Sequence, residues 1–368
     1  GHDDPKRLAA NAGNSFVGSY VLGMGFTFDD TDTGGVATPV AEMERILAEH
    51  PESRDAILPF IGGEEVNSSP THAHHRFVIN FGDRGEAECR DRWPELMTIA
   101  EGKVKPERMR NNREGYRRYW WQYGEKRVEL YAAIAGLDRV LVNSQVSARV
   151  QFALLPARTV FAHTTNVFRF STYAAFCALQ ARPHEIWARF FGSSMKDDLR
   201  YTPSDCFETF PFPEGWETHP ALEAAGKEYY EFRAEFMVRN DEGLTKTYNR
   251  FHDPVESQPD ILKLRELHAA TDRAVLAAYG WSDIDTECEF LLDYEVEEEE
   301  WSARRKKPWR YRWADEVQAE VLARLLELNA ERAREEVRAG TTTGKKRGRK
   351  KGGGASAPQS SSSGDLFG

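Results

Sequence analysis

Cysteine is scarce in this chain. The 368 residues include four cysteines, Cys89, Cys177, Cys206 and Cys288, which lie far apart and form no Cys-x-x-Cys pair. This spacing argues against a zinc site and gives no sign of a disulfide framework, so it is consistent with a reducing cytoplasm. The sequence also lacks a signal peptide and any apolar run near the ~20 residues of a membrane span. A cytoplasmic protein without membrane contact is therefore expected.

Catalytic motifs are also missing. No acid/base pair, nucleophile triad or metal-ligand spacing stands out. Gly18, Gly23 and Gly25 could suggest a nucleotide loop, but no suitable helix start follows, and glycines that allow bends in a sheet explain them better. His72, His74 and His75 have no acidic or cysteine partner at ligand spacing, so we interpret them as surface or DNA-facing histidines. The sequence therefore predicts no catalytic, cofactor or metal residue in this chain.

Positive charge is in the minority, yet it is concentrated in one segment. The chain has 49 Lys and Arg against 59 Asp and Glu, a net charge of −10, which by itself argues against a nucleic-acid partner. Residues 103–127 reverse this balance, with nine Lys or Arg, three Glu and five aromatic residues. Cations can bind phosphates, and aromatic rings can stack on bases. The alternative is a solvated charged helix whose aromatic side chains lie in a core, which we favour for Trp120 and Trp121. A helix is predicted from Glu107, with Arg110, Arg113 and Arg117 near one face.

The order of apolar patterns predicts an α+β (mixed α/β) domain followed by helices. Strands are predicted over residues 57–63, 76–81, 139–143, 160–163 and 166–170, with a long helix over Tyr173–Phe191. After Pro220 the pattern is helical, over residues 222–240, 260–279 and 309–338, which predicts a small bundle. From Gly340 the chain is rich in Gly, Ser, Lys and Arg and is expected to be a disordered basic tail.

One distinctive segment suggests a family. Residues 192–213, GSSMKDDLRYTPSDCFETFPFP, resemble the end of the target-recognition domain of MmeI-like restriction–modification enzymes and DNA methyltransferases. Shorter stretches between Asn11 and Glu336 resemble the same family in the same order. The resemblance implies that residues 1–14 end a linker from a methyltransferase domain, that 15–215 form the DNA target-recognition domain, that 216–338 form a spacer-like helical domain and that 339–368 form the tail.

The sequence departs from this family in one respect. The family's adenine-N6 methyltransferase domain carries an S-adenosylmethionine motif and an Asn/Asp-Pro-Pro-Tyr/Phe motif, and neither occurs here. The chain is therefore expected to select the DNA site while a domain absent from it binds S-adenosylmethionine and methylates, so its own status as an enzyme stays open. Expected partners are double-stranded DNA, a separate methyltransferase or nuclease subunit and, from the terminal Asp365-Leu366-Phe367, a bacterial sliding clamp. The alternative is a non-enzymatic module that binds a protein through acidic faces such as Glu295–Glu300.

The resemblance also implies site residues. In the family, the residues at the positions of Lys196 and Asp198 act as a pair that reads one base pair, and Lys can donate to guanine while Asp accepts from cytosine. The alternative is an exposed Lys and an exposed Asp at a turn. Further predicted base contacts are Asn143, Ser147 and Arg149, for which satisfied loop polar groups are equally plausible. The predicted phosphate contacts are Lys103, Lys105, Arg108, Arg110, Arg113, Arg117 and Arg118.

Overall fold

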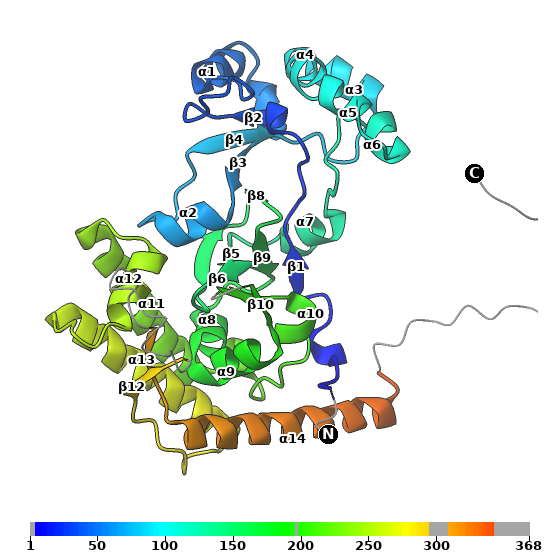
Figure 1. The fold of residues 1–368 in the computed structure, drawn as a ribbon. Helices are drawn as coiled ribbons and strands as arrows, with labels where there is room; N and C mark the ends of the chain where they lie inside the picture. The colour runs from blue at the N-terminus through cyan, green and yellow to red at the C-terminus, as the bar shows by residue number, and fades with distance from the viewer. Residues whose placement is uncertain (1–3, 196–197, 294–307, 342–368) are drawn as a thin grey trace, which may run out of the picture.

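The chain combines short strands with many helices, which confirms the predicted α+β class. The computed structural model describes residues 4–195, 198–293 and 308–341 (Figure 1). The strands are β1 (Ser15–Val17), β2 (Thr27–Phe28), β3 (Ile57–Ile61), β4 (Arg76–Ile79), β5 (Arg139–Ser144), β6 (Val146–Ser147), β7 (Ala153–Pro156), β8 (Val160–Phe161), β9 (Thr165–Phe168), β10 (Ser193–Met195), β11 (Asp198–Arg200), β12 (Glu289–Leu292) and β13 (Trp309–Arg312). The helices are α1 (Val40–Glu49), α2 (Gly63–Ser68), α3 (Glu86–Arg92), α4 (Pro94–Lys103), α5 (Lys105–Met109), α6 (Glu114–Arg118), α7 (Val128–Ile134), α8 (Tyr173–Gln180), α9 (Arg182–Phe191), α10 (Pro203–Cys206), α11 (Pro220–Asn240), α12 (Leu244–Phe251), α13 (Pro259–Tyr279) and α14 (Asp315–Ala339). Within the described ranges, every helix is too short or too polar to pass through a lipid bilayer.

Two four-stranded sheets form the framework. The first has the order β1-β9-β5-β7 and is antiparallel throughout. The second has the order β2-β4-β3-β8, in which β3 and β8 run parallel. Strand β5 is central in the first sheet because Val140, Leu141 and Val142 form a continuous apolar run, which suits a strand covered on both faces. Two smaller sheets, β10-β11-β6 and β12-β13, complete the structure.

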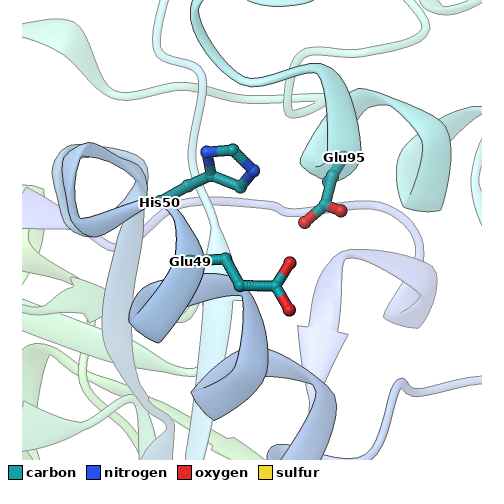
Figure 2. Close-up of side chains that lie close together, drawn as sticks. All are labelled: Glu49, His50 and Glu95. Atoms are coloured by element: carbon teal, nitrogen blue, oxygen red, sulfur yellow. The ribbon is translucent and has the colours of Figure 1, made fainter.

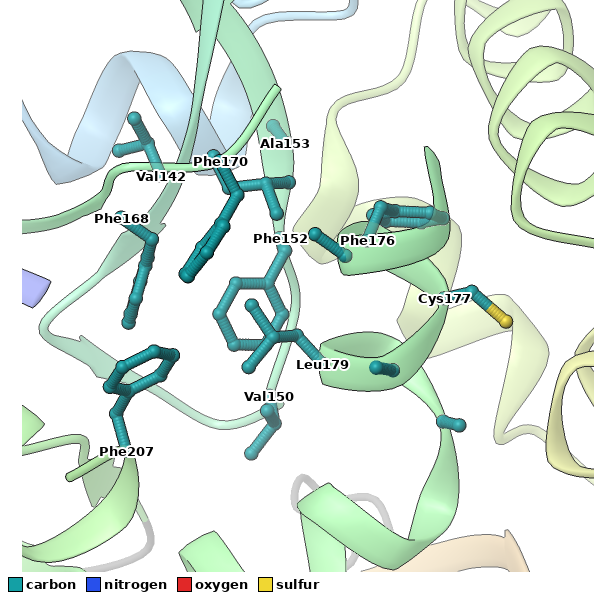
Figure 3. Close-up of a cluster of buried hydrophobic side chains, with 14 of the residues drawn as sticks. Val142, Val150, Phe152, Ala153, Phe168, Phe170, Phe176, Cys177, Leu179 and Phe207 are labelled. Atoms are coloured by element: carbon teal, nitrogen blue, oxygen red, sulfur yellow. The ribbon is translucent and has the colours of Figure 1, made fainter. Parts of the chain in front are cut away.

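Each four-stranded sheet has its own hydrophobic core. The second sheet packs with α1, α3 and α4 around a cluster that includes Phe28 and Trp93. The first sheet packs with α8 and the later helices around a larger cluster. Figure 3 shows Phe152 at the centre of that cluster, with Phe168 of β9 on one side and Leu179 of α8 on the other. Truncating such a buried Phe to Ala typically costs about 3–5 kcal/mol, so this cluster is a main source of stability.

The predicted helix over Tyr173–Phe191 is in fact two helices, α8 and α9, separated at Ala181. Ala181 has an extended backbone (ψ 156°), and the Arg182 N–H donates to Asp272 Oδ1 at 2.8 Å instead of continuing the ladder of α8. Pro183 then has no N–H with which to restore that ladder. A residue on α13 thus helps to set the direction in which α9 leaves α8.

The predicted helix over residues 309–338 is also wrong in its first turn. Trp309–Arg312 is strand β13, which pairs with β12, and α14 begins only at Asp315. The alternation of Trp309 and Tyr311 with two arginines is the period of two that indicates a strand. Helix α12 was not predicted at all. Of the predicted three-helix bundle, only the packing of α11 on α13 is found among the main contacts of the described residues; α11 also packs on α8, and α14 packs on α9.

Part of the predicted linker segment, residues 6–10, lies against α14 (Figure 1). Asn329 of α14 binds Lys6 twice, accepting from its N–H at 2.9 Å and donating to its carbonyl at 2.8 Å. The larger core also continues across the predicted domain boundary at 215–216, where the rings of Phe212 and Trp216 stack with centroids 3.9 Å apart. The predicted recognition and helical regions therefore share one core.

The glycines near the N-terminus allow close packing of main chains. A Cβ at Gly18 would lie 2.0 Å from the carbonyl oxygen of Ala162, and one at Gly25 would lie 2.6 Å from that of Lys103. Both positions exclude a side chain on steric grounds. This supports the structural interpretation of these glycines and not a nucleotide loop.

Candidate nucleic-acid interface

An exposed hairpin carries the first group of predicted site residues. Strands β10 and β11 pair antiparallel from Ser193 opposite Arg200 to Met195 opposite Asp198, and β11 also pairs with β6. Because side chains alternate along a strand, Asp198 and Arg200 share one face and Leu199 lies on the other. Asp198 and Arg200 are exposed, whereas Leu199 is half-buried. The predicted partner Lys196 lies outside the described residues, so the Lys196–Asp198 pair stays a prediction.

The base of this hairpin is held firmly in place. Gly192, at its start, packs so closely that an added Cβ would be 2.6 Å from the carbonyl oxygen of Ala188. At its end, the Tyr201 N–H donates to the Gln145 carbonyl at 2.8 Å, and the Tyr201 hydroxyl shares a 2.7 Å hydrogen bond with His184 Nε2. Burial lowers the pKa of His184 to about 3, so this imidazole is neutral at pH 7. The exposed strand ends are thus presented from a fixed support.

Arg200 belongs to this face, although the sequence analysis did not include it among the site residues. The signal that could have found it is the polar–apolar–polar order of Asp198, Leu199 and Arg200 in an extended segment. That order places an acid and a base two residues apart on the same side of a strand.

The other predicted base contacts do not lie on the exposed face. The predicted base contact by Asn143 is wrong, because its side chain is 2% exposed and its Oδ1 accepts from Asn166 Nδ2 at 3.0 Å. Ser147 pairs with Leu199 and therefore shares the half-buried face of the small sheet. Arg149 is half-buried, and its Nε has no hydrogen-bond partner in the described part of the chain. Base contacts by Ser147 and Arg149 stay predictions.

The basic segment is not one helix from Glu107. Helix α5 ends at Met109 and α6 begins at Glu114, with a turn between them. In that turn Asn111 Oδ1 accepts from the Arg113 N–H at 2.9 Å. An Asn side chain that bonds the main chain two residues on offers the backbone an alternative to the helical ladder. The arginines expected along one helical face therefore lie on a turn and a short helix.

The predicted phosphate contact by Arg108 is also wrong, because Arg108 is a core residue. Its side chain is 1% exposed, and it donates from Nε to the Leu22 carbonyl and from an Nη to the Val21 carbonyl, both at 2.9 Å. Leu22 has φ +54°, a conformation that a branched side chain rarely adopts. Burial lowers the pKa of Arg108. The guanidinium thus fastens a strained turn and is not available to a phosphate.

The side chain of Lys103 is also bound by backbone carbonyls. Its ammonium donates to the carbonyls of residues 35–37 at 3.0–3.3 Å. An ammonium has three donors, so none is left for a phosphate, and this assignment is also corrected. Lys105 is half-buried, pairs with Glu101 at 3.0 Å and lies over the ring of Trp120. A phosphate contact by Lys105 stays a prediction.

The remaining predicted phosphate contacts gather at α6. We call Arg110, Arg113, Arg117 and Arg118 the α6 arginine cluster. Three of its members are exposed, and the fourth, Arg117, is half-buried and donates to the Asn111 carbonyl at 2.5 Å. Arg113 donates to the Tyr116 hydroxyl at 2.9 Å, and Arg118 lies over the ring of Tyr119. These contacts orient the guanidinium groups while leaving further donors free, which suits contacts to a phosphate backbone.

The two tryptophans beside this cluster belong to the core. Trp120 is 4% exposed and Trp121 is 7% exposed, and Trp121 Nε1 donates to the Arg84 carbonyl at 2.9 Å. The core interpretation of this pair is therefore confirmed. Tyr119 is 45% exposed and is the aromatic residue in this segment that a base could reach.

A separate exposed group could at first suggest a metal site. Figure 2 shows Glu49 and His50 at the end of α1 facing Glu95 of α4, with ligand-type atoms within 4.8 Å of one another. Arg45 lies among them, 2.6 Å from the Glu49 carboxylate and 3.4 Å from that of Glu95. Its guanidinium balances the carboxylate charge, so an ion-pair network explains this group without a cation.

Comparison with known proteins decides the family. The family model described as the MmeI target recognition domain matches residues 17–214. This chain belongs to that family. The matched range contains the hairpin and the α6 arginine cluster, and it confirms the resemblance found in the sequence.

One solved structure extends the likeness beyond the matched domain. It is that of the type IIL restriction–modification enzyme MmeI in complex with DNA, which is 16% identical, with a TM-score of 0.60 over 89% of this chain and 37% of the MmeI chain. At this identity the match shows a shared fold. This chain thus corresponds to 37% of MmeI, and no curated protein matches it. The family and the fold together support DNA sequence recognition in a restriction–modification enzyme.

Proposed function

We propose that this chain selects the DNA site of a restriction–modification or adenine-N6 methyltransferase enzyme, and that the hairpin β10–β11 reads a base pair. The observation that carries the proposal is the exposed face with Asp198 and Arg200 on a rigid support, inside the MmeI target recognition domain. Arg200 can donate two hydrogen bonds to guanine O6 and N7, and Asp198 can accept one from cytosine N4. One G·C pair in the major groove would satisfy both side chains. Lys196 remains the alternative donor.

The α6 arginine cluster supplies the second part of the proposal. Contacts to phosphates fix the register of a protein on the duplex and provide most of the salt-dependent affinity. Three exposed arginines within nine residues, with two aromatic rings that orient them, suit this task. Base choice and general affinity would thus depend on different residues.

Catalysis would belong to another domain or subunit. The chain has no Asn/Asp-Pro-Pro-Tyr/Phe tetrapeptide and corresponds to 37% of MmeI, and both facts support this division. In the assembled enzyme, the catalytic part would bind S-adenosylmethionine and methylate an adenine turned out of the duplex. A nuclease could form part of the same assembly, which would act on DNA in the cytoplasm.

The first experiment is selection of bound duplexes from a random-sequence pool at two salt concentrations, followed by sequencing. The proposal predicts an enriched motif that contains a fixed G·C pair. Salt-sensitive binding without a motif would contradict base reading by this chain alone. An absence of binding would contradict the proposal as stated and would favour the protein-binding alternative.

The second experiment exchanges the charges on the hairpin. The double variant Asp198→Arg, Arg200→Glu should change the preferred base at one position, with roughly 5- to 150-fold discrimination, because a correct bidentate contact contributes about 1–3 kcal/mol. The matched control exchanges an exposed ion pair far from the hairpin in sequence, Arg239→Asp with Asp260→Arg, which are 3.2 Å apart on α11 and α13. An unchanged motif in the hairpin variant would refute base reading by these two residues.

A further inference from the structure

A valine lies beside the two charged residues of the hairpin. Strand β6 pairs with β11 so that Val146 is directly opposite Arg200, and Ser193 of β10 is opposite Arg200 on the other side. Residues directly opposite each other in an antiparallel pair share one face, with Cβ atoms about 4.5–5.5 Å apart. All three are exposed, and Val146 is 37% exposed. The exposed face of this small sheet, which we call the hairpin face, thus has an apolar side chain next to its arginine.

The backbone around Val146 is held from three sides. The Val146 carbonyl accepts from Ser144 Oγ at 2.9 Å. The Gln145 N–H donates to the Thr164 carbonyl, and the Gln145 carbonyl accepts from the Tyr201 N–H, both at 2.8 Å. A valine is also stiff at χ1, because it branches at Cβ. A contact made by Val146 would therefore cost little conformational entropy on binding.

The length of this side chain suits the edge of a base. A valine methyl carbon is about 2.5 Å from its Cα and makes apolar contacts at about 3.5–4.0 Å, so it touches atoms about 6–6.5 Å from that Cα. An aspartate oxygen is about 3–3.5 Å from its Cα and accepts hydrogen bonds at about 2.9 Å, which gives the same reach. Val146 and Asp198 can therefore contact base edges at a similar depth in the groove, while the longer Arg200 reaches further in.

Thymine is the base that offers a matching atom. Its 5-methyl group projects into the major groove, where the other base edges present hydrogen-bond donors and acceptors. Neighbouring strands are about 4.8 Å apart, and successive base pairs are about 3.4 Å apart. A side chain one strand away from Arg200 therefore meets the base pair next to the one that Arg200 would read.

We propose that Val146 contacts the 5-methyl group of a thymine in the base pair next to the G·C pair read by Arg200 and Asp198. This inference rests on the proposed function, because it requires duplex DNA to lie across the hairpin face. It adds an A·T pair to the selected site. It also assigns to Val146 an apolar contact, which should respond little to salt, whereas the phosphate contacts should respond strongly.

The test uses the full chain and the duplex enriched from the random-sequence pool. Replacing one thymine at a time by deoxyuridine removes the 5-methyl group and leaves the hydrogen-bonding edge of the base unchanged. At one position, next to the fixed G·C pair, deoxyuridine should weaken binding by about 4-fold, which is the effect of burying one methyl group. With cytosine at that position, 5-methylation should strengthen binding by about the same factor.

Substitutions at Val146 then assign the contact. Val146→Ala shortens the side chain by about 1 Å and should reduce the thymine-to-deoxyuridine ratio to less than about 2-fold. Val146→Ile keeps the methyl reach and should keep a ratio of about 4-fold. Both variants should keep the preference for the G·C pair and, since Val146 is exposed, the wild-type fold in circular dichroism. The matched control is Val238→Ala, which changes a valine of α11 that is 57% exposed and should leave the ratio unchanged.

The possible failures are distinguishable from one another. An enriched motif with a fixed G·C pair but no A·T pair beside it would overturn the inference. A ratio near 1 in the wild type, or a ratio of about 4-fold that persists in Val146→Ala, would overturn it as well. In all three cases base reading by the hairpin, and with it the proposed function, would stand. A selection that yields no motif would contradict both.

Discussion

Arg108 provides the sharpest test of which cations in the basic segment contact DNA. Replacing Arg108 by Gln would remove two hydrogen bonds to the carbonyls of Val21 and Leu22, which hold a turn with positive φ at Leu22. Hydrogen bonds made by a charged group contribute about 1.5–3 kcal/mol each. Removing the buried charge recovers part of this free energy, because a buried charge is itself costly. We therefore expect a net loss of about 3 kcal/mol in the free energy of unfolding. At an unfolding entropy of about 2.1 cal/mol/K per residue, this loss corresponds to about 4 °C in Tm for a chain of this size.

Calorimetry and a DNA-binding salt titration would measure both effects on the same protein. Arg108→Gln should unfold at a lower temperature, and at 15 °C, where it is still folded, its salt slope should equal that of the wild type. The matched variant is Arg113→Gln in the exposed α6 arginine cluster, which should keep its stability within about 0.5 kcal/mol and lose about 0.9 of the slope. An Arg108→Gln protein with wild-type stability and a reduced slope would refute the burial argument.

Two further predictions concern the core. The pKa values of His184 and His268 are lowered by burial to about 3 and about 4, so between about pH 6.5 and 4 the unfolded chain binds these protons and the folded chain does not. The free energy of unfolding should therefore fall by about 2 kcal/mol per histidine from pH 7 to 5. Urea titrations at both pH values would show this, His184→Gln should remove about 2 kcal/mol of the fall, and a flat profile would contradict it. Breaking the buried pair of Arg182 and Asp272 by Asp272→Ala should lower the free energy of unfolding by about 3–5 kcal/mol, since it leaves an uncompensated guanidinium. In the same urea titration, a loss under about 1 kcal/mol would show that the charge of Arg182 is not held in the core.

Predictions from the sequence succeeded where the signal was local. The apolar run at Val140–Val142 predicted a strand, and the helical spacing between Ile261 and Ala274 predicted α13 almost to its ends. They failed where a contact from a distant segment decided the outcome. The long helix predicted through Ala181 breaks where Pro183 has no N–H for the ladder, and its new direction is set by the bond from the Arg182 N–H to Asp272, which is 90 residues away. Nothing in the local pattern encodes such a bond.

The sequence by itself determined the family, the class of the fold and the concentration of cations in residues 103–127. Only the tertiary structure decided which of those cations are available to a ligand. Arg108 and Arg113 are chemically identical and five residues apart, yet one is enclosed by carbonyls 86 and 87 residues away and the other is exposed. The physical reason is that burial depends on which distant segments pack over a side chain. The same reason encloses Asn143, a predicted base contact whose Oδ1 accepts from Asn166, 23 residues away.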